Sequence, residues 1–446
     1  MNAPESFPTW PAQFAHTVAL RGEHPALMTV AGTLSYRELE QRSARMARAL
    51  LAIGAGKGTR ISLIAPDGEL WLCTFLASLR IGALVSAVST LCTAPELAYI
   101  LRNSDAQIVI GARRFLRHDY AQTLAAALPG LDAASAEMLR LPAAPYLRSI
   151  WLDDADGLTW AQSVDALLAR ADAPTAPDAA LLAAIEREVA PGDDAVIVYT
   201  SGSTSAPKAV VHTQRNVALH PPQVASYFLL QADDRMMPLL PAFWLGGMVM
   251  ALEVLSVGAT LVYPETPETA RVLDMIERCG VNRVNGWGDM LVKLREAASA
   301  RGIDVDRIVG LGLFRERSGA LIPPPLQVNM LGMSETFAVH SAEPLDVRLP
   351  ADKAGSSGRT VHGYERRIVN AETGEPVGVG EIGELQLRGG ALMSGFYKRE
   401  RCTVFTADGF YPTGDLVRVD GDGHLYFVAR RGDMIKTRAA NVSRLE

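Results

Sequence analysis

Apolar and polar residues follow two alternating periods along the first quarter of the chain. Helix-like spacing is found over about 36–53, 69–81 and 96–103, and short apolar runs typical of strands over 60–64, 83–88 and 107–110. Ser35 is a good N-cap for the first helix, and Glu38 three residues later completes a capping-box pattern. Strands that alternate with helices in this way indicate a parallel sheet with helices on both faces.

The hydrophobic pattern changes twice further along the chain. Residues 170–194 are rich in Ala, Asp and Pro and predict a linker with one helix over about 179–189, before a second alternating region from about 195 to 340. After about 346, short strands separated by glycine turns are predicted. We therefore predict an α/β protein with two doubly wound subdomains built on mixed or parallel sheets and a small β-rich, barrel-like subdomain. The expected boundaries are 1–194, 195–345 and 346–431, with a hinge and the start of a further domain at 432–446.

Composition and charge narrow the function classes. The chain has 446 residues, of which 48% are apolar, enough for two or three packed units. A net charge of −6 without a basic stretch argues against a nucleic-acid partner. No apolar run approaches the roughly 20 residues that a membrane span needs, and the N-terminus lacks the pattern of a signal peptide. The four cysteines have no paired spacing, so we expect free thiols, no zinc site and a cytoplasmic location.

A polar loop follows an apolar, strand-like run at 195–199. It contains Thr200, Ser201, Gly202, Ser203, Thr204 and Lys208. Glycine lets backbone N–H groups approach phosphate oxygens, hydroxyls donate hydrogen bonds, and lysine adds positive charge. The nucleoside-triphosphatase loop ends in Gly-Lys-Ser/Thr before a helix, whereas here Lys208 precedes a second strand-like run. From composition alone, a polyphosphate loop and a Ser/Gly-rich surface turn remain equally open.

The segment 199–213, Tyr-Thr-Ser-Gly-Ser-Thr-Ser-Ala-Pro-Lys-Ala-Val-Val-His-Thr, resembles the signature loop of the adenylate-forming superfamily. Acyl-CoA synthetases, luciferases and the adenylation domains of peptide synthetases belong to that superfamily. Ser205 and Ala209 replace two glycines usual there. Four further segments resemble family motifs in the family's order, and the resemblance covers nearly the whole chain: Pro-Ala-Phe-Trp-Leu-Gly-Gly at 241–247, Asn-Met-Leu-Gly-Met-Ser-Glu-Thr at 329–336, Tyr-Pro-Thr-Gly-Asp-Leu at 411–416, and Ala-Arg-Arg-Gly-Asp-Met-Ile-Lys at 429–436.

The resemblance implies roles for individual residues. Lys208, Thr204 and Glu335 would be the catalytic groups, and Glu335 would hold Mg²⁺, because a cation that bridges phosphates needs a carboxylate oxygen. The remaining nucleotide ligands would come from the loop hydroxyls together with Asn329, Leu331, Gly332, Ser334, Thr336, Asp415 and Arg430. Asp415 and Arg430 would bind the ribose, whereas Leu331 stands where an aromatic residue usually stacks on adenine.

Each of these residues also has a structural interpretation. Glu335 could cap a helix, Asp415 could belong to a turn, Arg430 could be a solvated charge at a strand end, and Trp244 could lie in the core at a helix start. Three consecutive prolines at 323–325 prevent a regular helix before the Glu335 motif, so we expect a compact loop on the adenine side.

The acid pocket is expected to be apolar. Its predicted residues are Phe243, Trp244, Gly246, Gly247, Trp287 and Met333. Such a lining favours a fatty, alicyclic or steroid-type acid, which ATP would activate as an acyl-adenylate before the acyl group passes to coenzyme A. A carrier protein as acceptor, a non-catalytic nucleotide-binding role and a homodimer remain open. In the family a further small domain supplies a lysine to the reacting carboxylate. We expect most of that domain to be missing from this chain and the first step therefore to be slow.

Overall fold

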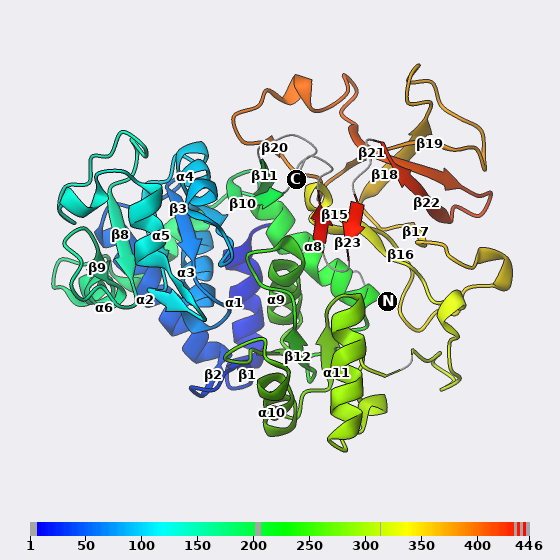
Figure 1. Ribbon diagram of the computed structural model, residues 1–446, viewed down its shortest axis with the longest axis horizontal. Coiled ribbons are helices and arrows are strands. Elements are labelled where there is room, and N and C mark those ends of the chain that lie inside the picture. The colour runs from blue at the N-terminus through cyan, green and yellow to red at the C-terminus, as the bar shows by residue number, and fades with distance from the viewer. Residues whose placement is uncertain (1–6, 201–206, 313, 432–434, 438–439, 443–446) are drawn as a thin grey trace.

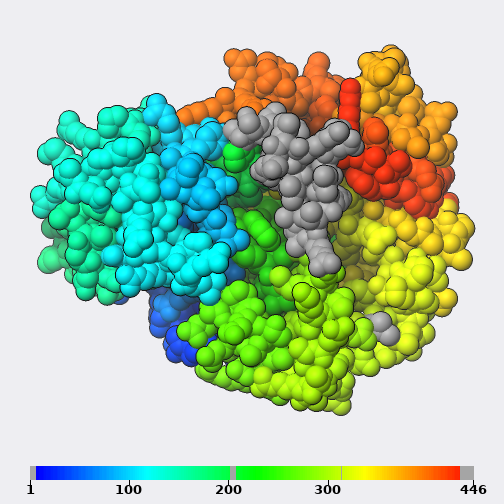
Figure 2. All heavy atoms as spheres, viewed as in Figure 1, coloured from blue at the N-terminus to red at the C-terminus, as the bar shows by residue number. Residues whose placement is uncertain are grey.

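Two mostly parallel sheets form the frame of the protein, and smaller antiparallel sheets follow them in the chain (Figure 1). The computed structural model describes residues 7–200, 207–312, 314–431, 435–437 and 440–442. In the space-filling view the blue-to-cyan N-terminal part and the yellow-to-red C-terminal part stand on opposite sides of the molecule (Figure 2). The predicted α/β class, with two doubly wound sheets and a β-rich part, is confirmed.

The larger sheet has eight strands. In spatial order these are β20 (Gly395–Phe396), β11 (Lys208–Thr213), β10 (Asp194–Thr200), β4 (Leu84–Ala87), β3 (Arg60–Ile64), β5 (Ile108–Gly111), β8 (Ser149–Leu152) and β9 (Gln162–Ser163). The strands from β10 to β9 run parallel, and β11 and β20 add an antiparallel edge. The carboxyl ends of β3, β4 and β10 therefore lie at one edge of this sheet.

The second sheet has five strands. Their order is β14 (Arg283–Asn285), β12 (Arg235–Pro238), β13 (Thr260–Val262), β1 (Pro25–Met28) and β2 (Thr33–Ser35). All neighbours are parallel except β1 and β2. Strand pairing crosses residue 194 in both directions, because β1 and β2 join the second sheet whereas β10 and β11 complete the first. The division at 194, like the boundaries at 345 and 431, stays a prediction.

Eleven α-helices lie within the described residues. They are α1 (Trp10–Arg21), α2 (Tyr36–Ala52), α3 (Glu69–Arg80), α4 (Ala94–Asn103), α5 (Tyr120–Ala127), α6 (Val164–Ala169), α7 (Ala179–Glu188), α8 (Gln214–Tyr227), α9 (Leu245–Val257), α10 (Thr269–Cys279) and α11 (Gly288–Ala300). The predicted capping box of α2 is present, since Ser35 and Glu38 each accept the backbone N–H of the other. None of these helices is long and apolar enough to cross a membrane.

One continuous apolar core joins the two sheets. It includes Trp10, Tyr36, Trp71 and Phe75 from the N-terminal helices and reaches Phe337 near the C-terminal sheets. Helix α9 is buried along almost its whole length, which explains why its sequence is apolar on every face. Residues of β15 (Leu331–Met333), β20 and β21 (Tyr411–Val419) instead belong to two smaller clusters, one around Phe396 and Tyr411 and one around Leu385 and Val417.

The C-terminal part contains two antiparallel sheets and short helices. The first consists of β15 (Leu331–Met333), β16 (Ala338–Ala342) and β17 (Arg359–Thr360), the second of β18 (Tyr364–Val369), β19 (Gly383–Gly389), β21 (Tyr411–Val419) and β22 (Leu425–Arg430), and β23 (Ile435–Thr437) pairs with β24 (Ala440–Val442). As the prolines predicted, the segment 323–326 forms no α-helix, only a 3-10 turn at Pro324–Leu326.

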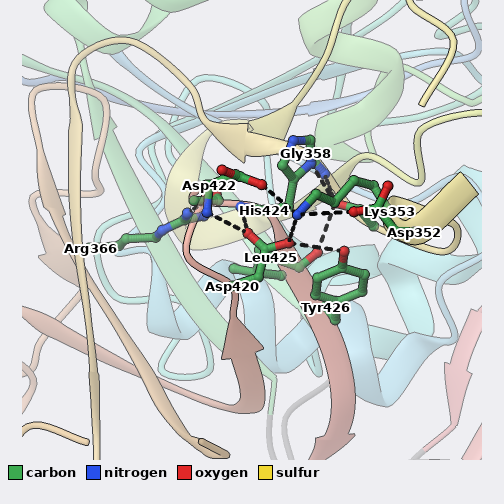
Figure 3. Close-up of polar contacts among 11 residues, drawn as sticks. Asp352, Lys353, Gly358, Arg366, Asp420, Asp422, His424, Leu425 and Tyr426 are labelled. Atoms are coloured by element: carbon green, nitrogen blue, oxygen red, sulfur yellow. Dashed lines mark hydrogen bonds and ion pairs between the residues drawn. The ribbon is translucent and has the colours of Figure 1, made fainter. Parts of the chain in front are cut away.

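A polar cluster closes the hairpin between β21 and β22 (Figure 3). Asp420 accepts the backbone N–H groups of Asp422 and His424 on one carboxylate oxygen, and Lys353 Nζ, 3.0 Å away, and the Tyr426 hydroxyl on the other. Burial alone would raise the pKa of Asp420, but the hydrogen bonds from Lys353 and from the backbone outweigh it and lower this pKa to about 2. The hairpin that carries Asp415 and Arg430 is thus fixed at its turn.

Candidate functional site

The predicted phosphate loop connects two paired strands. Thr200 at the end of β10 lies opposite Lys208 at the start of β11, so the two ends of the loop are adjacent. Ser201, Gly202, Ser203 and Thr204 lie outside the described residues. Because β10 is parallel to β4, Thr200 and Lys208 lie at the carboxyl edge of the large sheet, where open α/β sheets bind ligands.

Lys208 is connected to the rest of the site through aromatic rings. Its Nζ lies 5.4 Å from the centroid of the Phe396 ring, within the range of a cation–π contact. Phe396 in turn meets Tyr411 edge to face, with ring centroids 6.4 Å apart. Lys208 from the loop motif and Tyr411 from the Tyr-Pro-Thr-Gly-Asp motif are therefore neighbours of one aromatic side chain.

Glu335 is buried in a short 3-10 turn, Ser334–Thr336, between β15 and β16. Its Oε1 accepts a hydrogen bond from the Tyr411 hydroxyl over 3.0 Å. Burial, and next the charge of Glu335, raise the pKa of Tyr411 far above its usual value, so the phenol remains a donor. Within the described residues, which leave out 201–206, no side chain donates to Oε2.

These surroundings fit a magnesium ion bound by a single carboxylate. Mg²⁺ usually keeps several waters and takes one or two carboxylates together with the substrate phosphates. The described residues contain no cluster of three or more His, Cys, Asp or Glu that could form an all-protein metal cage. A single carboxylate such as Glu335 matches the first arrangement.

The neighbours of Glu335 hold the turn together. The Thr336 hydroxyl accepts the N–H of Met333 at 3.2 Å and donates to the carbonyl of Ala338 at 2.7 Å. Phe337 and Ala338 follow at positive φ, 48° and 94°, a strained conformation for non-glycine residues. Gly332 is needed because a Cβ there would lie 2.2 Å from the carbonyl oxygen of Ala338. Hydrogen bonds of the Thr336 hydroxyl therefore stabilise the turn. The phosphate roles of Thr336 and of the half-buried Ser334 stay predictions.

The adenine-side residues lie on and before β15. Asn329 is exposed, and its backbone N–H donates to the carbonyl of Ser356 over 2.9 Å. Leu331 is half-buried and packs against the core of the four-stranded sheet. The predicted nucleotide contacts of both residues remain predictions.

Asp415 and Arg430 lie directly opposite each other on β21 and β22. The Arg430 Nε is 3.8 Å from Asp415 Oδ1, and the Asp415 side chain is 7% exposed whereas that of Arg430 is one-third exposed at 33%. The charges of Asp415 and Arg430 both act on the pKa of Tyr411, which indicates that the pair lies near the phenol that donates to Glu335. The two predicted ribose ligands are thus side by side, and Asp415 lies on the strand that also supplies the partner of Glu335.

The predicted acid-pocket residues divide into two groups. Trp244 and Trp287 stand at the starts of α9 and α11, after the neighbouring parallel strands β12 and β14, and are 37% and 53% exposed. Phe243 is buried and packs edge to face on Trp244. Met333 instead packs against the cluster that contains Phe396 and Tyr411. Trp244 therefore is not a core residue, although it does begin a helix.

The two glycines of the Pro-Ala-Phe-Trp-Leu-Gly-Gly segment allow a close approach. A Cβ on Gly247 would lie 2.3 Å from the carbonyl oxygens of Leu240 and Pro241, and one on Gly246 would lie 2.9 Å from Leu240. These glycines let the start of α9 pack on the loop that precedes it. Whether they also contact an acid stays a prediction.

Sequence reasoning missed a cavity of about 150 Å³ beside Phe243. Its walls come from loops at the carboxyl ends of β3, β4, β12 and β13, and include Asp67, Thr90 and Tyr263. Asp67 Oδ1 accepts the backbone N–H of Ala242 over 2.8 Å, and burial raises the pKa of Asp67 to about 6. The Tyr263 hydroxyl is buried without a hydrogen-bond partner among the described residues. The one signal of this cavity in the sequence was Asp67, three residues after the strand predicted at 60–64.

Comparison with known proteins agrees with this geometry. Residues 14–397 match the family described as AMP-binding enzyme. The chain is 28% identical to a sulfoacetate–CoA ligase of Cupriavidus necator, over 99% of this chain and 83% of that protein. It is 31% identical to a salicyl-AMP ligase / salicyl-S-ArCP synthetase of Mycobacterium tuberculosis, over 96% of this chain and 72% of that protein. The crystal structure of the N-terminal domain of FACL13 from M. tuberculosis shares the fold, with a TM-score of 0.73 at 22% identity, over 95% of this chain and 99% of that one.

Proposed function

The chain belongs to the AMP-binding enzyme family, and from this premise we propose that it activates a carboxylic acid with ATP and transfers the acyl group to coenzyme A. One observation carries the proposal: Lys208, Phe396, Tyr411 and Glu335 form a continuous series of contacts, and Asp415 lies on β21, the strand that begins with Tyr411. This series supports a common site for phosphate, metal and ribose, which are the parts of one nucleotide.

The chemistry follows from the charges at this site. The acid's carboxylate attacks the α-phosphorus of ATP, the bond to the bridging oxygen breaks, and pyrophosphate leaves. Lys208 offsets negative charge on the phosphates, and a magnesium ion bound at Glu335 would add to this neutralisation. Asp415 accepts hydrogen bonds from ribose hydroxyls and orients the nucleotide. The protein thus contributes mainly position and charge stabilisation.

An apolar acid is the favoured substrate class. Trp244 and Trp287 expose large apolar side chains at the carboxyl edge of the second sheet, and Met290 on α11 is also exposed. Apolar side chains at the ligand-binding edge of a sheet favour an apolar ligand. We infer a fatty, alicyclic or steroid-type body rather than an amino acid.

A carrier protein is the second candidate for the acceptor. The relative with 31% identity is named for transfer to such a carrier as well as for adenylate formation. An acyl-transfer assay that offers either free coenzyme A or a phosphopantetheinyl carrier separates the two acceptors.

Calorimetry tests the proposal on this chain without requiring turnover. We expect MgATP to bind and acyl-sulfamoyl adenosines, stable analogues of the acyl-adenylate, to bind more tightly. Octanoyl, cyclohexanecarbonyl, cholanoyl and glycyl analogues compare the acid classes directly, and the glycyl analogue should be the weakest. No binding of MgATP or of any analogue would contradict the proposed function, and pyrophosphate exchange with the preferred acid would exclude a non-catalytic role.

A further inference from the structure

We propose that His212 is a positioning residue that holds the Glu335 turn in the geometry that binds MgATP. The inference rests on the proposed function and assigns a role to a residue for which the family resemblance implies none. His212 lies on β11, four residues after Lys208, and is fully buried. Its Nε2 is 2.7 Å from the carbonyl oxygen of Ser334, the residue before Glu335.

The tautomer of His212 follows from its two partners. A carbonyl oxygen can only accept, so Nε2 carries the proton and donates it to Ser334. Nδ1 is then the acceptor, and the Asn216 amide nitrogen, 2.9 Å away, donates to it. The same amide nitrogen contacts the carbonyl oxygens of Ala391 and Leu392, each at 3.0 Å. Asn216 thereby fixes the imidazole ring and ties it to the loop after β19.

All three backbone carbonyls of the turn are held from different elements. Ser334 is held by His212 from β11, and the carbonyl of Glu335 accepts the N–H of Met393 over 2.8 Å. The carbonyl of Thr336 accepts the hydroxyl of Tyr364 from β18. Only the contact from His212 comes from the strand that also carries Lys208, so this residue joins the phosphate strand to the turn that bears the carboxylate.

Burial keeps the His212 ring uncharged near neutral pH. Burial lowers the pKa of His212 to about 3, and the hydrogen bond to Ser334 offsets only part of that effect. The ring therefore remains a donor at Nε2 and an acceptor at Nδ1 above about pH 5. A change in this contact should alter affinity for the metal-bound nucleotide without adding a new pH dependence near neutrality.

The test compares MgATP with metal-free AMP by calorimetry. His212→Leu removes the donor, and we expect MgATP affinity to fall about tenfold while metal-free AMP affinity changes less than twofold. His212→Gln can place an amide N–H near the same carbonyl and should restore MgATP affinity to within about threefold of the natural protein. His340→Leu is the matched control, because His340 is an equally buried histidine whose described contact is to Ser341 and not to the turn.

The same substitution in a Glu335→Gln protein tests whether His212 acts through Glu335. In Glu335→Gln protein, His212→Leu should cause no further loss of MgATP affinity, since its effect acts through the carboxylate. If His212→Leu does not fold, Asn216→Leu should give the same selective loss. An equal loss for AMP and MgATP, no rescue by Gln, or a full tenfold effect without Glu335 would each overturn the inference. If the natural protein itself did not bind MgATP, that result would instead contradict the proposed function.

Discussion

The Tyr411 hydroxyl donates to Glu335 Oε1 across 3.0 Å, although 76 residues separate the two in the chain. Each belongs to a different segment that the sequence marks as a motif. The bond orients one carboxylate oxygen, and it joins the turn after β15 to the first residue of β21. The same strand carries Asp415 four residues further on.

Replacing Tyr411 by Phe should weaken binding of MgATP. The ring remains to pack on Phe396, but Glu335 loses the donor that orients it, and hydrogen bonds to charged groups contribute about 1.5–3 kcal/mol. We expect roughly a tenfold loss in MgATP affinity and little change for metal-free AMP, measured by calorimetry. Tyr426→Phe is the control, since Tyr426 bonds to Asp420 at the hairpin turn. An unchanged MgATP affinity would show that Tyr411 has only a packing role.

Replacing Asp415 by Asn should weaken binding of AMP with or without metal. Asn keeps the volume but replaces one acceptor oxygen by an NH₂ group. This group cannot accept hydrogen bonds from the ribose hydroxyls or from Arg430. We expect about a tenfold loss of AMP affinity in titrations followed by calorimetry. Asp422→Asn on the neighbouring hairpin turn removes an exposed carboxylate and should leave AMP affinity unchanged. Equal effects of the two variants would argue against a ribose contact at Asp415.

Replacing Asp67 by Asn should stabilise the protein in a pH-dependent way. Burial raises the pKa of Asp67 from 3.8 to about 6, so the folded protein retains a proton that the unfolded chain releases. The contribution of Asp67 to the free energy of unfolding therefore falls as pH rises from about 4 to 6, and it stays at its lower value above pH 6. Asn can still accept the Ala242 N–H, and we expect a gain of about 2 kcal/mol at pH 8.

Urea unfolding at several pH values checks this expectation. The difference in unfolding free energy between Asp67→Asn and the natural protein should shrink towards pH 4.5. A difference that is the same at pH 4.5 and pH 8 would mean that the carboxyl is not protonated in the fold. Asp153→Asn, in another loop that follows a strand of the same sheet, offers a control with the same charge change.

Three buried histidines should make the fold sensitive to acid. Burial lowers the pKa of His212 and His340 to about 3 and that of His220 to about 4, from 6.5. The unfolded chain therefore takes up protons below pH 6.5 that the folded chain excludes, and stability falls as pH falls through that value. Each histidine contributes about 1.4 kcal/mol per pH unit well below pH 6.

The slope of unfolding free energy against pH between 6 and 4.5 measures this effect. His340→Leu should reduce the slope by about 1.4 kcal/mol per pH unit, because one of the three groups no longer titrates. An unaltered slope in His340→Leu would show that this histidine titrates equally in both states.

The local helices and strands and the positions of the motifs could be predicted from the amino-acid sequence. Capping at Ser35 and Glu38, the apolar strands and the proline-rich break at 323–325 depend on neighbours within a few residues, so their outcome could be predicted from the chain. The motif order also placed Lys208, Glu335, Asp415 and Arg430 in one functional hypothesis.

Which of these segments meet depends on the folded arrangement of the whole chain. Strand pairing across residue 194, the contact of Tyr411 with Glu335 and the bond from His212 to Ser334 over 122 residues leave no periodic trace in the sequence. The cavity beside Asp67 forms where four strand ends from two sheets converge. Such contacts depend on how sheets stack and pair, a choice made by the whole apolar core rather than by the residues beside each motif.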